Sequence, residues 1–393
     1  MKKVAIVYHY LAHYRLPIFQ ELMKDDSIQY TLISGDTSEI NINKIPTTLA
    51  TQEPKNGGLR WHILKNSWIL KDKFLWQHGL ISIIQENKYD AYIFLGNPYH
   101  ISTWFSVIIA RLNKKKVFYW MHGFYKKKIT SVDYIKLFLF YQLANGFFLY
   151  GNRAKKRLEE LGIKTQENIN VIYNSLDYEN SLRFRRQIDQ TSIFNFRLNL
   201  FKDPSLPTIC FIGRVNLTKR IDLLIEVQKL NFQKSGSPLF NLLVIGDGDE
   251  LINLISFAKT GIDVQNNTAF VGAIYREEEI ANLIQHSDLC VIPGEVGLTA
   301  MHSLTYGTPV ISHDNLDIQM PEVEAIIPDI TGDLYIYENL EDLRDKIDKW
   351  IQKYPVKSTK LIERCYEVID KYYNPNYQSS VFKKVLLANL IDL

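Results

Sequence analysis

The fold is decided by the stretch Val291-Ile292-Pro293-Gly294-Glu295-Val296-Gly297-Leu298-Thr299-Ala300-Met301-His302-Ser303-Leu304-Thr305-Tyr306-Gly307-Thr308-Pro309-Val310. The apolar run 288–292 has the length of a buried strand, and a turn with proline and glycine ends it. Apolar side chains then return at helical spacing up to Gly307, which suits the left-handed residue that ends a helix. Pro309 cannot continue that helix. The stretch therefore predicts a strand, a turn, a helix and a second strand, which is the repeating unit of an α/β domain.

The turn in this stretch is a candidate anion site. It is predicted to present the backbone N–H groups of Val296, Gly297 and Leu298 at a helix N-terminus. Because Gly297 has no side chain, an anion can approach the backbone closely. A phosphate site is the functional interpretation, and an ordinary connection of an α/β domain is the alternative.

The length and composition indicate a folded protein with more than one domain. At 393 residues the chain is too long for one typical hydrophobic core, so two domains are expected. Hydrophobic residues make up 46% and charged residues 23%, as in folded soluble proteins. The formal charge of +3 gives no indication of nucleic-acid binding. Cys210, Cys290 and Cys365 are far apart, and two lie in apolar runs, so buried reduced thiols are expected rather than disulfides or a metal site.

Two sequence features bear on the compartment. The apolar run 4–8 is too short for a signal peptide and predicts a first strand. No run reaches the ~18 apolar residues of a membrane span. A cytoplasmic protein is expected.

Strand-like and helical patterns alternate in two blocks. In the first block the expected strands are 4–8, 30–34, 61–64, 91–95, 116–121, 146–150 and 169–173, with helices at 16–23, 74–85, 102–112, 134–143 and 154–161. In the second block the expected strands are 208–213, 241–245, 268–271, 288–292 and 309–312, with helices at 221–230, 250–259, 277–286, 298–306, 340–352, 360–372 and 379–391. Such alternation predicts parallel sheets with helices on both faces, which bind ligands beyond the carboxyl ends of their strands.

The change of rhythm between the blocks predicts the domain boundaries. Residues 1–180 form the expected first domain and residues 207–372 the second. Residues 181–206 are polar, charged and without strand-like runs, so they are expected to form a linker. Residues 373–393 are expected to form a C-terminal helix that packs back across the first domain.

Two cations follow the first strand of the second block. Gly213 and Arg214 end that strand, and Lys219 comes shortly before the next helix. Such a pair can clamp a diphosphate and stabilise it as a leaving group. A solvated surface pair is the alternative.

A glycine turn follows the next strand. It consists of Gly246, Asp247 and Gly248, and it lacks the full three-glycine fingerprint of a dinucleotide site. A nicotinamide-dependent enzyme is therefore weakly supported. Together with the turn at 294–297, the three loops at one sheet edge predict binding of a phosphate-bearing ligand.

These motifs resemble those of the retaining glycosyltransferases of family 4, which have the GT-B fold. The resemblance runs nearly the full length and is strongest over 209–334. Gly213, Arg214 and Lys219 look like the residues with which that family holds the donor diphosphate. The segment 244–248 resembles its glycine turn. The resemblance implies two Rossmann-like domains that face each other across a cleft.

Further segments carry the same resemblance. Phe270-Val271-Gly272 looks like the family's strand beside the nucleotide base, which implies that Ala273 and Ile274 lie near the base. His122 resembles the first-domain histidine that faces the donor sugar. Asn174-Ser175-Leu176-Asp177 resembles the Asn-Gly-Val-Asp segment that closes the first domain.

The sequence departs from the family at two glutamates that flank the donor turn and its helix. Gly294 and His302 stand at those positions, and Glu295 follows one residue late. In the family the first glutamate contacts hydroxyls of the donor sugar and the second contacts the ribose. Neutral His302 can still hydrogen-bond a ribose, although it lacks the two acceptors of a carboxylate. A packing histidine at 302 and an exposed turn residue at 295 are the alternatives. The segment 319–324 also differs, which indicates a divergent branch.

The first domain carries the candidate acceptor-side residues. His13 and Arg15 follow the first strand and are candidates to bind a phosphate or acceptor hydroxyls, with a plain surface charge as the alternative for Arg15. Lys114-Lys116 and Lys126-Lys128 are interleaved with aromatic residues, which suits contact with an anionic bilayer. A solvated lysine-rich face is the alternative. On the membrane reading the acceptor is a lipid-linked sugar.

The resemblance implies a metal-independent glycosyltransferase, with retention, in surface polysaccharide assembly (capsule, lipopolysaccharide or exopolysaccharide). The donor is a nucleoside diphosphate sugar, the acceptor is a glycan or lipid-linked sugar, and no cofactor or nucleic acid is expected. His122, Arg214 and Lys219 are the expected catalytic residues. Gly213, Gly246, Asp247, Ala273, Ile274, Glu295, Val296, Gly297, Leu298 and His302 are the expected donor-binding residues. A nucleotide-sugar epimerase with the GT-B fold and a non-catalytic sugar-nucleotide-binding subunit are the alternatives.

Overall fold

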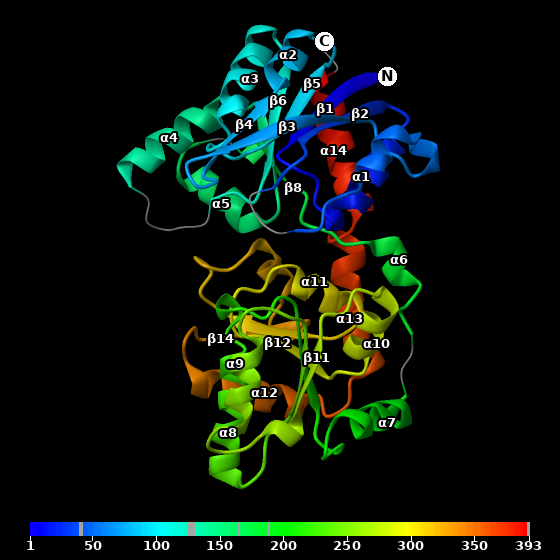
Figure 1. The fold of residues 1–393 in the computed structure, drawn as a ribbon, viewed down its shortest axis with the longest axis vertical. Coiled ribbons are helices and arrows are strands. Elements are labelled where there is room, and N and C mark those ends of the chain that lie inside the picture. Colours follow the sequence, from blue (N-terminus) through cyan, green and yellow to red (C-terminus); the bar gives the residue numbers. More distant parts are fainter. Residues whose placement is uncertain (39–41, 125–129, 164–165, 187–188, 391–393) are drawn as a thin grey trace. The chain divides into compact units, whose positions relative to one another are not determined.

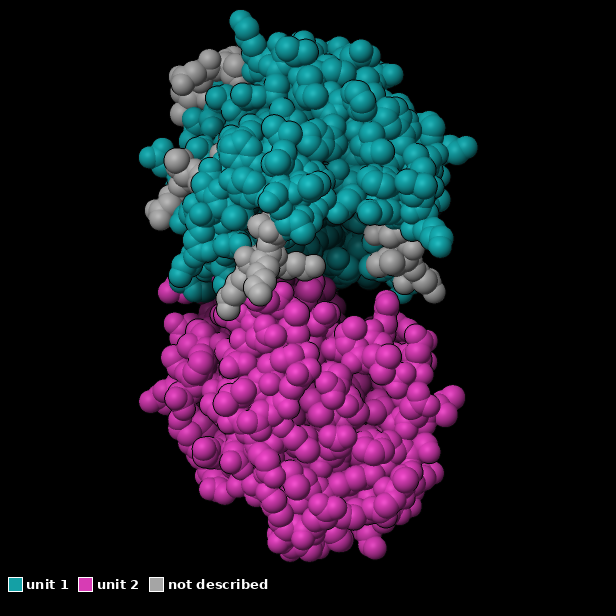
Figure 2. All heavy atoms as spheres, turned by 90° about the vertical axis from the view of Figure 1, so that its left-hand side faces the viewer, with its two compact units in different colours: residues 1–177, 372–393 teal, residues 178–371 magenta. Residues whose placement is uncertain are grey.

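The computed structural model describes residues 1–38, 42–124, 130–163, 166–186 and 189–390 (Figure 1). The chain divides into two units, coloured separately in Figure 2. The first consists of residues 1–177 and 372–393, and the second of residues 178–371. Each is an α/β domain built on a largely parallel sheet, as the alternating pattern predicts.

In the described part of the first unit, eight strands form one sheet in the order β4-β3-β2-β1-β5-β6-β7-β8. Their bounds are β1 (Lys2–Tyr8), β2 (Ile28–Gly35), β3 (Trp61–Ile69), β4 (Phe74–His78), β5 (Ala91–Leu95), β6 (Lys116–Met121), β7 (Gly146–Leu149) and β8 (Ile169–Val171). Neighbouring strands of this described sheet are parallel, except that β4 runs antiparallel to β3. The central place of β1 puts the loop after it at the middle of the sheet edge.

Alternate residues of β1 build a core on each face of this sheet. Val4, Ile6 and Tyr8 belong to one cluster, and Ala5 and Val7 to the other. The helices are α1 (Leu16–Met23), α2 (Leu80–Gln85), α3 (Ile101–Leu112), α4 (Ser131–Gln142), α5 (Asn152–Glu160) and α14 (Pro375–Leu390). The first cluster is covered by α1 and α14, and the second by α2 to α5 (Figure 1).

The C-terminal helix packs on the first unit, which confirms that part of the predicted fold. Phe382, Leu386 and Leu390 of α14 are fully buried in the same cluster as β1 and α1. The ring of Phe382 lies 4.4 Å from that of Phe148 on β7. Near the start of α14, Gln378 accepts a hydrogen bond of 2.6 Å from the Ser175 hydroxyl.

The predicted helix 74–85 is wrong in its first half, which is strand β4. Leu70, Lys71 and Asp72 all have positive φ angles and turn the chain back along β3. Gln77 is then buried within the sheet, and its amide donates to the carbonyl of Tyr8 over 3.0 Å. Gly79, with a φ of 84°, ends the strand before α2 begins. The spacing of the apolar residues in 74–85 is compatible with a helix and with a strand. The turn at 70–72 favours a strand, because it returns the chain alongside β3.

In the described part of the second unit, six parallel strands are arranged as β11-β10-β9-β12-β13-β14. Their bounds are β9 (Thr208–Ile212), β10 (Asn241–Ile245), β11 (Thr268–Gly272), β12 (Leu289–Ile292), β13 (Val310–His313) and β14 (Gly332–Tyr335). The helices are α6 (Tyr178–Leu182), α7 (Gln190–Leu200), α8 (Asp222–Ser235), α9 (Leu251–Lys259), α10 (Glu277–Gln285), α11 (Leu298–Thr305), α12 (Leu340–Lys353) and α13 (Thr359–Tyr372). Because β9 stands between β10 and β12, the three predicted phosphate loops emerge from adjacent strands.

The segment 181–206, predicted as a linker, contains α7 and lies within the second unit. Its helix is fastened by side-chain contacts. Arg197 forms an ion pair of 2.6 Å with the nearly buried Asp288, and Ser192 hydrogen-bonds His286 over 2.8 Å. The polar composition of this segment therefore reflects a surface helix with specific partners.

Candidate functional site

The loops after β9, β10 and β12 are joined by backbone hydrogen bonds. The N–H of Val215 donates to the carbonyl of Asp247 over 2.9 Å, linking the first loop to the second. The N–H groups of Gly294 and Glu295 donate to the carbonyls of Lys219 and Thr218 over 3.0 and 3.2 Å, linking the first loop to the third. The three predicted motifs therefore form one continuous surface at the carboxyl edge of the sheet.

Two glycines allow this close approach. A Cβ atom at Gly246, where φ is 153°, would lie 1.9 Å from the carbonyl oxygen of Gly213. A Cβ atom at Gly294 would lie 1.9 Å from the carbonyl oxygen of Thr218. No side chain fits at either position without moving the backbone of the β9 loop. This close packing is a structural reason for a glycine at position 294.

Lys219 is the half-buried cation of this surface. Its ammonium group donates to the carbonyl oxygen of Glu295. Burial lowers the pKa of Lys219, and the nearby charge of Arg214 acts in the same direction, whereas Glu295 and Glu322 oppose the shift. Arg214 itself is exposed. The site thus combines a fixed ammonium group with an exposed guanidinium group.

The N–H group of Val296 is not free, which corrects one predicted anion contact. It donates to Oε1 of the buried Gln319 over 2.9 Å. The Gln319 amide in turn donates to the hydroxyl of Ser312 and the carbonyl of His313, over 2.7 and 3.1 Å. Gln319 therefore holds the turn at 294–297 against β13, and the sequence gives no signal for this long-range contact. Gly297 and Leu298 at the start of α11 remain as candidates, because the first N–H groups of a helix have no acceptor within it.

His302 meets a carboxylate from another element. Its Nδ1 lies 3.9 Å from Oε1 of Glu277, the first residue of α10. The hydroxyl of the buried Tyr306 also donates to that oxygen. Burial lowers the pKa of His302, and Glu277 opposes the shift. The sequence did not identify Glu277 as a candidate. It is far from His302 in the chain, and only the tertiary fold brings the two side chains together.

The remaining donor-side candidates lie at the same sheet edge. Ala273 and Ile274 directly follow β11, whose last residue accepts a hydrogen bond of 2.8 Å from the N–H of Gly246. Ala273 is exposed, and Ile274 is partly buried. Asp247 is exposed, and its carboxylate accepts from the N–H of Gly248 over 2.7 Å.

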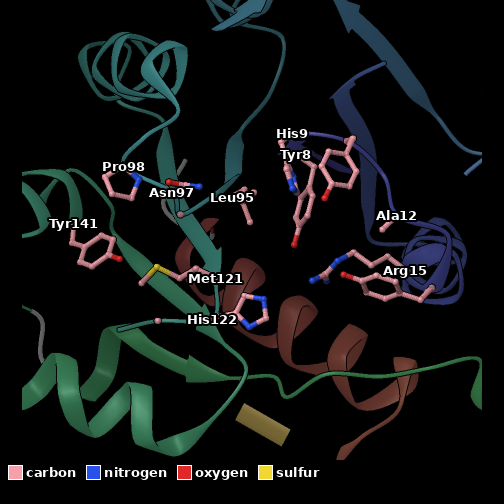
Figure 3. A pocket seen from close by; sticks show the side chains of 14 residues that line it. Tyr8, His9, Ala12, Arg15, Leu95, Asn97, Pro98, Met121, His122 and Tyr141 are labelled. Atoms are coloured by element: carbon pink, nitrogen blue, oxygen red, sulfur yellow. The ribbon is translucent and has the colours of Figure 1, made fainter. Parts of the chain in front are cut away.

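The first unit has a cavity of about 390 Å³ at the carboxyl edge of its own sheet (Figure 3). It opens between the loops after β1, β5 and β6. The lining residues are Tyr8, His9, Tyr10, Ala12, Tyr14, Arg15, Leu95, Gly96, Asn97, Pro98, Met121, His122, Gly123 and Tyr141. This volume lies within the range of small-molecule sites, ~300–1,000 Å³.

The cavity brings together two of the three residues predicted in the first unit, Arg15 and His122. Arg15 is only 5% exposed, which excludes the alternative of a plain surface charge. Figure 3 shows the guanidinium group of Arg15 pointing into the cavity. The ring of His122 lines the same cavity. His13 is exposed and does not line the cavity.

His122 is a neutral group in this cavity. Burial, helped by the charge of Arg15, lowers its pKa to about 4. Its ring lies 4.7 Å from that of Tyr150. At neutral pH the imidazole therefore offers one donor and one acceptor nitrogen, which suits sugar hydroxyls.

The two lysine clusters differ in what the structure describes. Lys126-Lys128 lies outside the described residues. Of Lys114-Lys116, Lys114 is exposed and the other two are half-buried at the start of β6. Among the described residues, no helix is both long and apolar enough to cross a bilayer.

Comparison with known proteins shows which folds and families this chain is similar to. Residues 193–368, which lie within the second unit, match the family model Glycosyl transferases group 1. No curated protein sequence matches the chain. Several solved glycosyltransferase structures share the whole two-unit fold. The protein thus has the GT-B architecture.

Three of these structures illustrate the likeness. The Anabaena protein Alr3699/HepE in complex with UDP has a TM-score of 0.71 and 13% identity, covering 99% of this chain and 100% of its own. A glycosyltransferase from Rickettsia africae has a TM-score of 0.71 and 16% identity, covering 98% of each chain. The apo form of the lipopolysaccharide outer core galactosyltransferase WaaB has a TM-score of 0.68 and 13% identity, covering 99% of this chain and 100% of its own. At these identities the likeness establishes the fold alone.

Proposed function

We propose that the protein is a glycosyltransferase that moves a sugar from a nucleoside diphosphate sugar to a glycan or lipid-linked acceptor. The observation that carries the proposal is the joined surface of three loops around Lys219 in the second unit. The family match over residues 193–368 covers these loops. HepE, which has the same fold, was solved with UDP, which supports a nucleoside diphosphate as the donor group.

The donor-side residues suit a leaving diphosphate. When the bond between the anomeric carbon and the diphosphate oxygen breaks, negative charge builds up on the diphosphate. Lys219, Arg214 and the first N–H groups of α11 would stabilise that charge. Since Lys219 is already fixed by the carbonyl of Glu295, little reorganisation accompanies the step. We expect neither a metal ion nor a cofactor to be needed for this stabilisation.

The first unit would supply the acceptor and orient the sugar. His122 is neutral and borders the cavity, so its role is to hydrogen-bond the donor sugar rather than to attack it. The resemblance to family 4 implies retention of the anomeric configuration. In that reaction the acceptor hydroxyl forms the new bond, and its proton passes to the departing diphosphate.

A surface of α3 and α4 supports a lipid-linked acceptor. Large apolar side chains that are 43–77% exposed recur at helical spacing on both helices: Phe105, Ile108, Leu112, Val132, Ile135 and Leu139. The two helices meet at one point, where the rings of Trp104 on α3 and Phe140 on α4 lie 4.8 Å apart (Figure 1). We call these six residues the apolar strip.

Cationic side chains accompany the apolar strip. Arg111 and Lys114 are exposed at the end of α3, and Lys136 of α4 is partly exposed. Exposed apolar residues flanked by cations are typical of surfaces that rest on an anionic bilayer. We propose that the protein works at the inner face of the cytoplasmic membrane. We further propose a role in surface polysaccharide assembly, which the fold shared with the lipopolysaccharide galactosyltransferase WaaB supports.

A thermal-shift screen tests the donor assignment. UDP-, GDP- and dTDP-sugars are added in turn, because a ligand that binds the folded state raises the melting temperature. We expect one nucleotide series to stabilise the protein and its sugar to be transferred to a membrane extract. Turnover of the donor without an acceptor would indicate an epimerase instead. Binding without hydrolysis or transfer would indicate a non-catalytic subunit.

A further inference from the structure

The Arg15 guanidinium group is a buried cation with no anionic partner in the described structure. The side chains acting on its charge are those of Tyr150, Tyr8 and Tyr14, and among the described residues no aspartate or glutamate lines the cavity. A buried charge without an opposite partner is unfavourable, because no ion pair offsets the loss of its hydration. A ligand anion would remove that cost.

Aromatic rings fix the position of this cation without neutralising it. Its central carbon lies 5.1, 5.3, 5.4 and 5.2 Å from the rings of Tyr8, Tyr14, Trp120 and Tyr150. The rings brace one another, since the Tyr8 and Trp120 centroids are 5.5 Å apart and the Tyr8 and Tyr150 hydroxyls 3.3 Å apart. Cation–π contacts stabilise the guanidinium group, but the rings carry no net charge. The group is therefore held in place before any ligand binds.

The other polar groups of the cavity are neutral at physiological pH. Burial lowers the pKa of both His122 and His9, and the charge of Arg15 acts in the same direction. Asn97, Tyr14 and Tyr141 add uncharged polar groups. The cavity thus presents one fixed positive charge among groups that suit hydroxyls, and it disfavours a cationic ligand such as an amino sugar.

We propose that this cavity binds an acceptor sugar with one acidic substituent, a carboxylate or a phosphate, and that Arg15 pairs with that substituent. A guanidinium group has five N–H donors in a planar fork, and both oxyanions accept from it in a bidentate manner. The inference rests on the proposed function, because it names the acceptor class of the same transfer reaction.

Binding measurements on the full-length protein test this assignment. Methyl glucuronoside, glucose 6-phosphate and methyl glucoside are titrated in turn and followed by calorimetry. We expect at least one of the two acidic sugars to bind about tenfold or more tightly than the neutral one, as a charge-assisted contact requires. Comparing the two acidic sugars distinguishes a carboxylate from a phosphate.

Variants identify the residue responsible. Arg15→Gln should reduce the preference for the acidic sugar to less than about threefold, whereas Arg15→Lys should keep part of it. Lys24→Gln removes one exposed charge from the end of α1, outside the cavity, and should leave the preference unchanged. Should Arg15→Gln fail to fold, the wild-type comparison still decides, since equal binding of acidic and neutral sugars would overturn the proposal.

The affinity for UDP separates this inference from the proposed function. Arg15→Gln should bind UDP within about twofold of the wild type. A large loss of UDP binding would instead assign Arg15 to the donor diphosphate and overturn the inference. Selective binding of acidic sugars by a protein that binds no nucleotide would contradict the proposed transfer reaction and leave the anion site standing.

Discussion

The imidazole of His302 on α11 and the carboxylate of Glu277 on α10 lie together, with Nδ1 and Oε1 3.9 Å apart. The resemblance to family 4 implies that His302 takes the position of the glutamate that contacts the ribose. Glu277 brings a carboxylate to that place from another helix, and the Tyr306 hydroxyl holds it by a hydrogen bond. The pair thus offers the acceptor oxygen that a histidine alone lacks.

Glu277→Gln should therefore weaken nucleotide binding. We expect about a tenfold loss of affinity for the donor nucleotide, because a charged acceptor for the ribose hydroxyls is replaced by a neutral amide. Calorimetric titration with UDP, or with the nucleotide found in the screen, measures it. Glu278→Gln is the matched control, since this neighbouring glutamate is more exposed and pairs with Arg186 and Arg276. Equal effects of the two substitutions would exclude a specific role for Glu277.

Lys219→Ala should abolish transfer while leaving the protein folded. Loss of a charge that stabilises the leaving diphosphate is expected to lower kcat by about 10²–10³-fold. Lys234→Ala, which removes an exposed lysine paired with Glu341 on the same unit, should retain full activity. Steady-state kinetics with the identified donor measure both variants, and unchanged turnover of Lys219→Ala would refute the donor-site assignment.

The dependence of the transfer rate on pH is a second test of Lys219. Because burial lowers the pKa of Lys219, its charge is lost at a lower pH than that of a free lysine. Transfer should therefore decline on the alkaline side. In Lys219→Arg the decline should move to higher pH, since arginine stays charged.

How far the sequence predicted this site depended on the range of the contacts. Gly213, Arg214 and Lys219 could be proposed from the sequence because parallel strands deliver consecutive loops to one edge, so local motifs suffice. Gln319 and Glu277 were missed because each meets the donor turn or its helix only through the tertiary fold. The burial of Arg15 could not be predicted either. An arginine that follows a strand has the same sequence pattern whether water or aromatic rings surround it in the fold.

The turn between β3 and β4 shows the same limit for the fold. Three consecutive non-glycine residues, Leu70, Lys71 and Asp72, adopt positive φ angles there. Positive φ angles are uncommon for non-glycine residues, so the local sequence does not predict a turn at this place. Pairing of β3 with β4 stabilises it, and that pairing is a long-range effect.

Gly246→Ala should damage both stability and donor binding. The added methyl group would meet the carbonyl of Gly213 in the loop that carries Arg214. We expect a loss of about 2 kcal/mol or more in the free energy of unfolding. Gly236→Ala is the control, because this glycine also has a positive φ but open space around it, so its cost should be about 1 kcal/mol. Calorimetric unfolding compares the two, and equal losses would mean that close loop packing is not what requires Gly246.

The apolar strip on α3 and α4 should bind membranes. Ile135→Glu combined with Leu139→Glu places negative charge on a surface proposed to contact an anionic bilayer. We expect co-sedimentation with phosphatidylglycerol vesicles to fall severalfold, and wild-type binding to phosphatidylcholine vesicles to be weak. Ile252→Glu changes a residue that is 80% exposed on the second unit and should have no effect. Wild-type protein that stays in the supernatant with anionic vesicles would contradict the membrane proposal.

The histidines of the first unit should make it acid-sensitive. His100 is 3% exposed, and burial lowers its pKa to about 4. Between that value and about 6.5 the unfolded chain binds a proton that the folded chain does not, so stability falls as the pH falls through this window. From pH 7.5 to pH 5 the expected loss is about 2 kcal/mol for this residue alone.

His100→Phe removes the titration while keeping a ring beside His9, whose centroid lies 5.6 Å away. Between pH 7.5 and pH 5 the melting temperature of the variant should fall by less than that of the wild type. Part of the loss should remain, because burial also lowers the pKa of His122 to about 4. His62→Phe, at an exposed position on β3, is the matched control for the loss of one histidine. If His100→Phe is as acid-sensitive as the wild type, buried neutral His100 is not a source of the instability.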